Sequence, residues 1–269
     1  GTPGAGGNVT FADPVVLATD ITITTGATAG NISFQSTLDS AATDANTLAL
    51  TAGTGSIAFT GAVGSGATQE LGAVTIVSAT DVTASSTFEA ASLTQTAGTG
   101  TTMLDGVVTT AANVSLTTAT IDIDANVVTN GGDVDLNATT LVDLATGTSI
   151  TTTGNAAGEA GGDVDIDVSG TGTVNLVGAL VTTGNANAAG AGGTGGDVTI
   201  DTANGTVSVT AITSDGGAAT TTGNNNGGAA GDVAINTDSS NIITLNGAIS
   251  AAGGTPTGTG TPGAGGNVT

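Results

Sequence analysis

Apolar and polar residues alternate over short stretches of this chain. Examples are Val134-Asp135-Leu136 and Val164-Asp165-Ile166, in which two apolar residues flank one polar residue. This alternation has the two-residue period of a β-strand, and no apolar stripe repeats at the 3.6-residue period of a helix. Gly and Thr also recur at intervals too short for long helices. The pattern therefore predicts an all-β protein.

One strand signature recurs along the chain: Asp or Asn, then two apolar residues on either side of a polar one. It begins at Asn8, Asn31, Asn113, Asp133, Asp163, Asp197, Asp232 and Asn267. From Asn113 onward the intervals grow from about 20 to about 35 residues, and each holds about three short strands. The growth lies in Gly/Asn/Ala-rich loops such as 183–196 and 220–231. One loop in each turn therefore lengthens while the set of strands keeps its size.

Three short strands in each turn are the arrangement of a parallel β-helix, a solenoid in which turns stack about 4.8 Å apart. We predict about ten turns, a rise of about 48 Å, with the first apolar residues of successive signatures forming inward columns. The predicted columns are Val134, Val164, Val198 and Val233, and beside them Leu136, Ile166, Ile200 and Ile235.

The first ten residues, GTPGAGGNVT, recur unchanged as residues 260–269. A recurrence of this length predicts a tandem array. We expect residues 1–259 to form one repeat period, with irregular turns over 1–112 and more regular turns over 113–259. Residues 260–269 are then the start of the next identical period.

The strands GGDVDL and GGDVDI, the stretch Thr47–Gly55 and the sequence SLTQTAGTG at Ser92–Gly100 resemble repeats of giant bacterial surface proteins. These are the filamentous-haemagglutinin-like adhesins and related β-strand repeat exoproteins. The resemblance covers nearly the whole chain. It implies a right-handed β-helix, secretion from a bacterium, and a role in adhesion or in cell-surface filaments.

The composition excludes most catalytic chemistry, because the chain has no Lys, Arg, His, Cys, Trp or Tyr. No imidazole can act as a base, no thiol as a nucleophile and no amine as a Schiff base. We therefore predict that the protein is not an enzyme. The net charge of −22 includes no cation, so we expect no nucleic-acid partner, and no apolar run is long enough to insert into a membrane.

Four aspartates of the signature are the candidate site: Asp133, Asp163, Asp197 and Asp232. In the predicted register they stack as one column, with Asn8 and Asn31 in neighbouring turns. Two interpretations stay open. The side chains can accept backbone hydrogen bonds, as Asn does in other turns. Alternatively, Ca²⁺ can bridge the column as a metal site, with further oxygens from neighbouring aspartates.

Residues Gly190–Gly195 match the letters of the dinucleotide motif GxGxxG. The motif requires a strand before it and a helix after it, whereas here a strand follows. We expect a flexible loop.

Together these features predict an extracellular structural protein on a bacterial cell surface. It would form a long acidic β-helical fibre, stalk or sheath, with itself as partner, joined end to end and in lateral contacts. The alternative is an adhesin, in which the Gly/Asn-rich loops bind a receptor or glycan on another cell and the rod is a spacer.

Overall fold

The computed structural model describes residues 6–66, 68–221, 223–237 and 241–269. Within these residues the chain consists of β-strands and connecting segments. None of the described residues belongs to a helix that could span a bilayer. The chain divides into two compact units, residues 1–126 and 127–269, which are described separately. The prediction of an all-β protein is confirmed.

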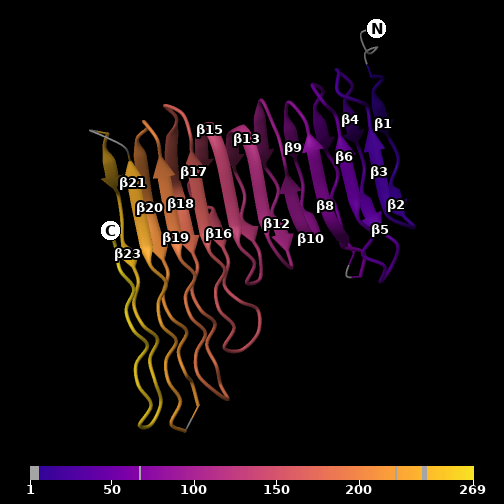
Figure 1. Ribbon diagram of the computed structural model, residues 1–269. Coiled ribbons are helices and arrows are strands. Elements are labelled where there is room, and N and C mark those ends of the chain that lie inside the picture. Colours follow the sequence, from indigo (N-terminus) through magenta and orange to yellow (C-terminus); the bar gives the residue numbers. More distant parts are fainter. Residues whose placement is uncertain (1–5, 67, 222, 238–240) are drawn as a thin grey trace. The chain divides into compact units, whose positions relative to one another are not determined.

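Unit 1 holds strands β1 to β13. Their bounds are β1 Val9–Phe11, β2 Val15–Leu17, β3 Ile21–Thr24, β4 Ile32–Phe34, β5 Leu38–Ser40, β6 Leu48–Thr51, β7 Ile57–Phe59, β8 Leu71–Ser78, β9 Val82–Ala84, β10 Phe88–Gln95, β11 Thr101–Leu104, β12 Val108–Thr110 and β13 Val114–Ile123. These strands pair in parallel and form ladders such as β1–β4–β7–β9–β11 and β3–β6–β8–β10 (Figure 1).

Unit 2 holds strands β14 to β23. Their bounds are β14 Val127–Val128, β15 Val134–Leu144, β16 Ser149–Thr151, β17 Val164–Val168, β18 Thr173–Val181, β19 Val198–Thr202, β20 Val207–Thr213, β21 Val233–Thr237, β22 Ile243–Leu245 and β23 Ile249–Ser250. Strands β15, β17, β19 and β21 pair in parallel, one above the next. A second ladder continues from β15 through β18 and β20 to β22.

The core consists of columns of aliphatic side chains that run through these ladders. The predicted columns in unit 2 are confirmed: Val134 pairs with Val164, Val164 with Val198, and Val198 with Val233, and all four are buried. The neighbouring column of Leu136, Ile166, Ile200 and Ile235 is buried too. Stacked β-branched side chains fill a narrow interior without aromatic anchors.

In unit 1 an aromatic stack supplements the aliphatic core. The rings of Phe11, Phe34 and Phe59 are stacked, with centroids 4.9 and 5.5 Å apart, and Phe88 meets Phe59 edge-on at 5.5 Å. These are the four phenylalanines of the chain. Offset aromatic contacts stabilise a core beyond the area that they bury.

The predicted fold class, a right-handed parallel β-helix with about three short strands per turn, is wrong in this simple form. The strand pairing contains a closed barrel of 7 parallel strands with extra strands attached, rather than a simple solenoid. The physical reason is that several strands are too long to belong to one ladder. In unit 1, β10 pairs with β8, β12 and β13, and in unit 2, β18 pairs with β15, β16 and β20. Such strands continue around a bend and join ladders that a simple solenoid keeps apart.

Extended hairpins project from unit 2, and Figure 1 shows them running side by side from one edge of its strands. We call them the arms: residues 152–162, 182–196, 214–221 with 223–231, and 251–266. Their limbs are joined by backbone hydrogen bonds, such as Gly193 N–H to Asn185 O (2.9 Å) and Gly228 N–H to Gly217 O (2.9 Å). Bonds also connect successive arms, as from Gly227 N–H to Thr261 O at 3.0 Å.

The arms differ from the flexible loop predicted for Gly190–Gly195. Gly192 donates its N–H to Asn226 O (3.1 Å), and a Cβ at Gly192 would overlap the carbonyl oxygen of Gly217. The glycines are therefore required for close backbone packing, and they do not mark a chain without partners. Sequence reasoning took Gly enrichment as a sign of flexibility because it could not show that the limbs approach so closely.

Candidate functional site

The four predicted aspartates lie together in unit 2, each directly before a strand. Asp133, Asp163, Asp197 and Asp232 precede β15, β17, β19 and β21. Because the buried valine that follows each aspartate sets the register of its strand, the four side chains take the same place in successive layers. The predicted column therefore exists among these four residues.

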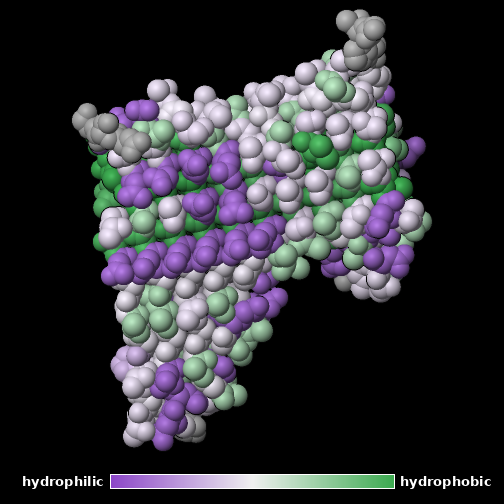
Figure 2. Space-filling model, in the orientation of Figure 1, coloured by the Kyte–Doolittle hydropathy of each residue, from purple (hydrophilic) through white to green (hydrophobic). Residues whose placement is uncertain are grey.

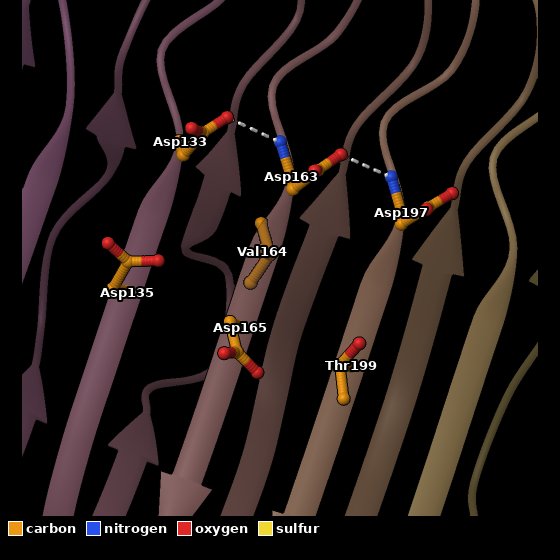
Figure 3. A pocket seen from close by; sticks show the side chains of 7 residues that line it. All are labelled: Asp133, Asp135, Asp163, Val164, Asp165, Asp197 and Thr199. Carbon is orange, nitrogen blue, oxygen red and sulfur yellow. Dashed lines mark hydrogen bonds between the residues drawn. The ribbon is translucent and has the colours of Figure 1, made fainter.

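Each carboxylate in this column accepts a backbone hydrogen bond from the next layer. Asp133 Oδ1 accepts the N–H of Asp163 at 3.0 Å, and Asp163 Oδ1 accepts that of Asp197 at 2.7 Å (Figure 3). Asp197 Oδ1 likewise accepts the N–H of Asp232 at 2.7 Å. A charged acceptor makes a short, strong hydrogen bond, so the side chains extend the strand ladder by one bond in each layer.

The column ends at Asn267, which donates hydrogen bonds to the last aspartate. Asp232 Oδ1 accepts the N–H of Asn267 at 2.7 Å, and the Asn267 amide nitrogen lies 3.3 Å from both carboxylate oxygens. The geometry thus contains the backbone-acceptor interaction, one of the two interpretations that the sequence left open.

Two further polar columns lie beside the first on the outer face of the same strands. Asp135 pairs with Asp165, and Asp165 with Thr199, whereas Asp167 pairs with Asp201 and Asp201 with Asn236. Figure 2 shows rows of hydrophilic side chains that run across the strands. The first two columns line a shallow hollow of about 270 Å3, formed by Asp133, Asp135, Asp163, Val164, Asp165, Asp197 and Thr199.

The crowding of carboxylates raises the pKa of two of them. Partial burial is the larger cause of the raised pKa of Asp135, followed by repulsion from Asp133 and Asp163. The pKa of Asp165 is raised by partial burial and then by repulsion from Asp135, Asp167 and Asp201. The ionised face therefore stores electrostatic repulsion at neutral pH, and protonation or a cation would relieve it.

The predicted Ca²⁺ site stays a prediction. Among the described residues, no group of three or more His, Cys, Asp or Glu has the arrangement of a metal site. The carboxylates of the four column aspartates lie in a row, one in each layer. One oxygen of each already accepts a backbone N–H. Ca²⁺ needs six to eight oxygens that converge on one point, and a row of carboxylates does not by itself supply them.

In unit 1, asparagine and aspartate side chains also accept backbone N–H groups from the next layer. Asn8 Oδ1 accepts the N–H of Asn31, and Asn31 Oδ1 accepts that of Ser56, both at 2.9 Å. Asp81 accepts the N–H of Thr101 at 2.9 Å, and Asp20 that of Thr47 at 2.8 Å.

Sequence reasoning missed Asp20 and Asp81, although both stand directly before an apolar–polar–apolar strand in the same pattern as the signature. The hydrogen bond to Thr47 lowers the pKa of Asp20.

The sequence predicted that the signatures form one column, but in the structure they begin strands of different ladders. Within unit 1, Asn31 precedes β4, which belongs to the ladder β1–β4–β7. Asn113 precedes Val114 of β13, which pairs with Leu93 of β10 in another ladder. Identical signatures can start different ladders because strands of both ladders have inward apolar residues and begin after the same kind of side-chain acceptor.

No family model, curated protein or solved structure matches this chain.

Proposed function

We propose that the chain is part of an extracellular structural protein of a bacterial cell surface, which forms a long acidic fibre, stalk or sheath from stacked parallel strands. The observation that carries this proposal is the use of the aspartate column. Each of its carboxylates fixes the backbone of the next layer, so the most regular polar residues of unit 2 serve stacking. The protein has no catalytic role in this proposal, and its partner is itself, end to end and in lateral contacts.

The second candidate is an adhesin whose loops bind a receptor or glycan, and the asparagine-rich arms are the feature that suggests it. The arms, however, use these side chains within the molecule. Asn224 Oδ1 accepts the N–H of Thr259 at 3.0 Å, and Asn226 Oδ1 that of Thr261 at 2.9 Å. Asn187 donates to Ala191 O at 2.8 Å in its own arm. Asparagines that hold one arm to the next favour a structural role.

The resemblance to filamentous-haemagglutinin-like surface proteins supports the proposal through its strand motifs alone. The composition agrees with an exposed location, because a chain without Lys or Arg offers no cleavage site to trypsin-like proteases. A stack of layers is also the architecture in which repetition and backbone pairing can replace disulfides, and this chain has no cysteine.

The proposal is tested with the purified chain by analytical ultracentrifugation and negative-stain electron microscopy over a range of concentrations. We expect filaments whose length grows with concentration. Particles that stay monomeric and bind glycans or cell-surface receptors would instead support the adhesin.

A further inference from the structure

The last layer of unit 2 exposes side chains of a kind that the layer beneath it buries. Ile243 and Leu245 of β22 are 40% and 55% exposed, whereas their ladder partners Val207 and Val209 of β20 are each 1% exposed. These residues occupy core positions of the ladder, so β22 presents an apolar surface that a further strand would cover.

The first layer of unit 1 presents an apolar surface as well. A hollow of about 400 Å3 is lined by Phe11, Val15, Val16, Leu17, Ala18, Thr19, Ile21, Ile23 and Phe34. These residues come mainly from β1, β2 and β3, and Val16 is 56% exposed. The corresponding positions one layer further in, such as Ile32 and Leu48, are buried.

The chain itself shows which sequence fits on the last layer. Val268 pairs in parallel with Val233 of β21, with Val233 N–H to Asn267 O at 2.8 Å and Thr269 N–H to Val233 O at 2.9 Å. Asp232 also accepts the N–H of Asn267. The tripeptide Asn267-Val268-Thr269 is identical to Asn8-Val9-Thr10, which contains the first residues of β1. The surface of β21 therefore binds a copy of the sequence that opens unit 1.

We propose that strands β1, β2 and β3 of a second copy of this chain stack on β21, β22 and β23, with Val9 in the place that Val268 occupies. The spacing agrees with this register for the second and third strands, whereas the connection from β21 to β22 is longer than the connection from β1 to β2. Val15 and Ile21 are separated by the same number of residues as Ile243 and Ile249, the first residues of β22 and β23. Val15 and Leu17 then cover Ile243 and Leu245, and Val16 faces outward beside Thr244.

The contact is head to tail. The last layer of unit 2 in one copy meets the first layer of unit 1 in the next copy, and because these are two different surfaces the association is open-ended. This inference rests on the proposed function, and it specifies which strands of two copies pair in the fibre. The strand Asn267–Thr269 competes for the same place, because its sequence is identical to that of the incoming strand.

The register is tested with cysteines, because the chain has none of its own. Full-length chains carrying Thr244→Cys are mixed with chains carrying Val16→Cys and oxidised mildly. Neighbouring parallel strands lie about 4.8 Å apart, within the Cα separation of a disulfide. The matched control is Ala12→Cys, also exposed but outside β2. We expect intermolecular disulfides between positions 244 and 16 several-fold above the control, identified by mass spectrometry.

A second variant shows whether weak cross-linking results from competition by the chain's own Asn267–Thr269 or from a lack of binding between copies. Val268→Asp disfavours the chain's own strand on Val233 and leaves Val9 of the incoming copy intact, so cross-linking between positions 244 and 16 should rise several-fold. Cross-linking equal to the Ala12→Cys control, with and without Val268→Asp, overturns the inference. If filaments still form in that case, the structural function stands and only this register fails. If no filaments form at any concentration, the proposed function fails too.

Discussion

Aspartate and asparagine share one task at the start of many strands of this protein. Asp163, Asp197 and Asp232 each accept a backbone N–H from the next layer, and Asn8 and Asn31 do the same in unit 1. A side-chain oxygen in this place continues the ladder beyond the strand end. The charge of aspartate is not needed for it, since the neutral amide oxygen of asparagine reaches the same donor.

The acceptor role predicts different effects for two substitutions of Asp197. Asp197→Asn keeps an oxygen for the N–H of Asp232 and should leave the free energy of unfolding within about 0.5 kcal/mol of the parent. Asp197→Ala removes the acceptor and should lower it by about 1 kcal/mol, the usual contribution of one hydrogen bond. Urea denaturation measures both. Equal losses for Asn and Ala would show that the carboxylate charge is what matters.

The calcium interpretation gives a separate expectation for the same column. If Ca²⁺ bridges the carboxylates, added Ca²⁺ raises the melting temperature, EDTA removes the gain, and Asp197→Asn abolishes it. If the melting temperature is the same in Ca²⁺ and in EDTA, the calcium interpretation is wrong and only the backbone-acceptor role remains.

Repulsion on the acidic face predicts that acid stabilises unit 2 locally. The raised pKa of Asp165 means that the folded state binds this proton more readily than the unfolded chain. Proton binding to Asp165 therefore stabilises the folded state fully at a pH below the unfolded pKa, near 3.8. This stabilisation is lost as the pH rises through the folded pKa of Asp165. Asp165→Asn should stabilise the protein at pH 7 by about 0.5 kcal/mol, after allowance for solvent screening.

Denaturation at pH 7 and at pH 3 checks this expectation, since the gain should vanish at the lower pH. Asp13→Asn is the matched control, because it changes the net charge equally at an exposed residue before β2. A gain that persists at pH 3, or that Asp13→Asn reproduces, would contradict the local explanation.

The arms depend on glycine for their packing. Gly228 N–H bonds to Gly217 O, and a Cβ at Gly228 would overlap the carbonyl oxygen of Gly193. Buried hydroxyl groups hold the limbs together where the arms leave the strands. For example, the hydroxyls of Thr182 and Ser214 both donate to Gly196 O at 2.7 Å. Backbone atoms thus form the interior of the arms.

Substituting Gly228 should loosen the arms and leave the strands in place. Gly228→Ala should cost about 2 kcal/mol or more, because the overlap is with backbone rather than with a flexible side chain. Gly265→Ala is the control in the same set of arms, since its Cβ has an ordinary contact of 3.5 Å with Ala251 O. Hydrogen exchange of arm amides such as Gly254 N–H should accelerate in the first variant and not in the second.

The sequence pattern determines which side chains of a strand point inward, but it does not determine which strands pair. Alternation fixed the inward columns of Val164 and Ile166 correctly, because a one-residue slip would reverse every side chain of the strand. The signature also located the aspartate column of unit 2. It could not assign Asn31 and Asn113 to different ladders, because the strands that follow them begin with the same pattern.

Two further features were beyond the sequence. The closure of the strand pairing depends on whether a strand such as β18 continues around a bend, and alternation continues through the bend unchanged. The packing of the arms depends on the approach of limbs that are distant in sequence, so the glycines of 190–196 could not be distinguished from a flexible loop.

We expect the whole molecule to assemble through an end layer that exposes core residues, namely Ile243 and Leu245 of β22. Replacing Leu245 by Asp places a charge on this apolar surface and should raise the concentration needed for assembly by about tenfold or more. Sedimentation measures that concentration. Val177→Asp is the control, because Val177 is exposed within β18, away from the last layer. Equal effects of the two substitutions would point to lateral contacts instead.

X-ray diffraction from oriented assemblies of the purified chain would show whether each copy continues the strand stack of the next. If copies stack layer upon layer, the strand spacing of about 4.8 Å repeats along the long axis and gives a reflection in that direction. A 4.8 Å reflection perpendicular to the long axis, or a solution of monomers that yields no oriented assemblies, would contradict the claim that this protein builds a fibre by continuing its own stack of strands.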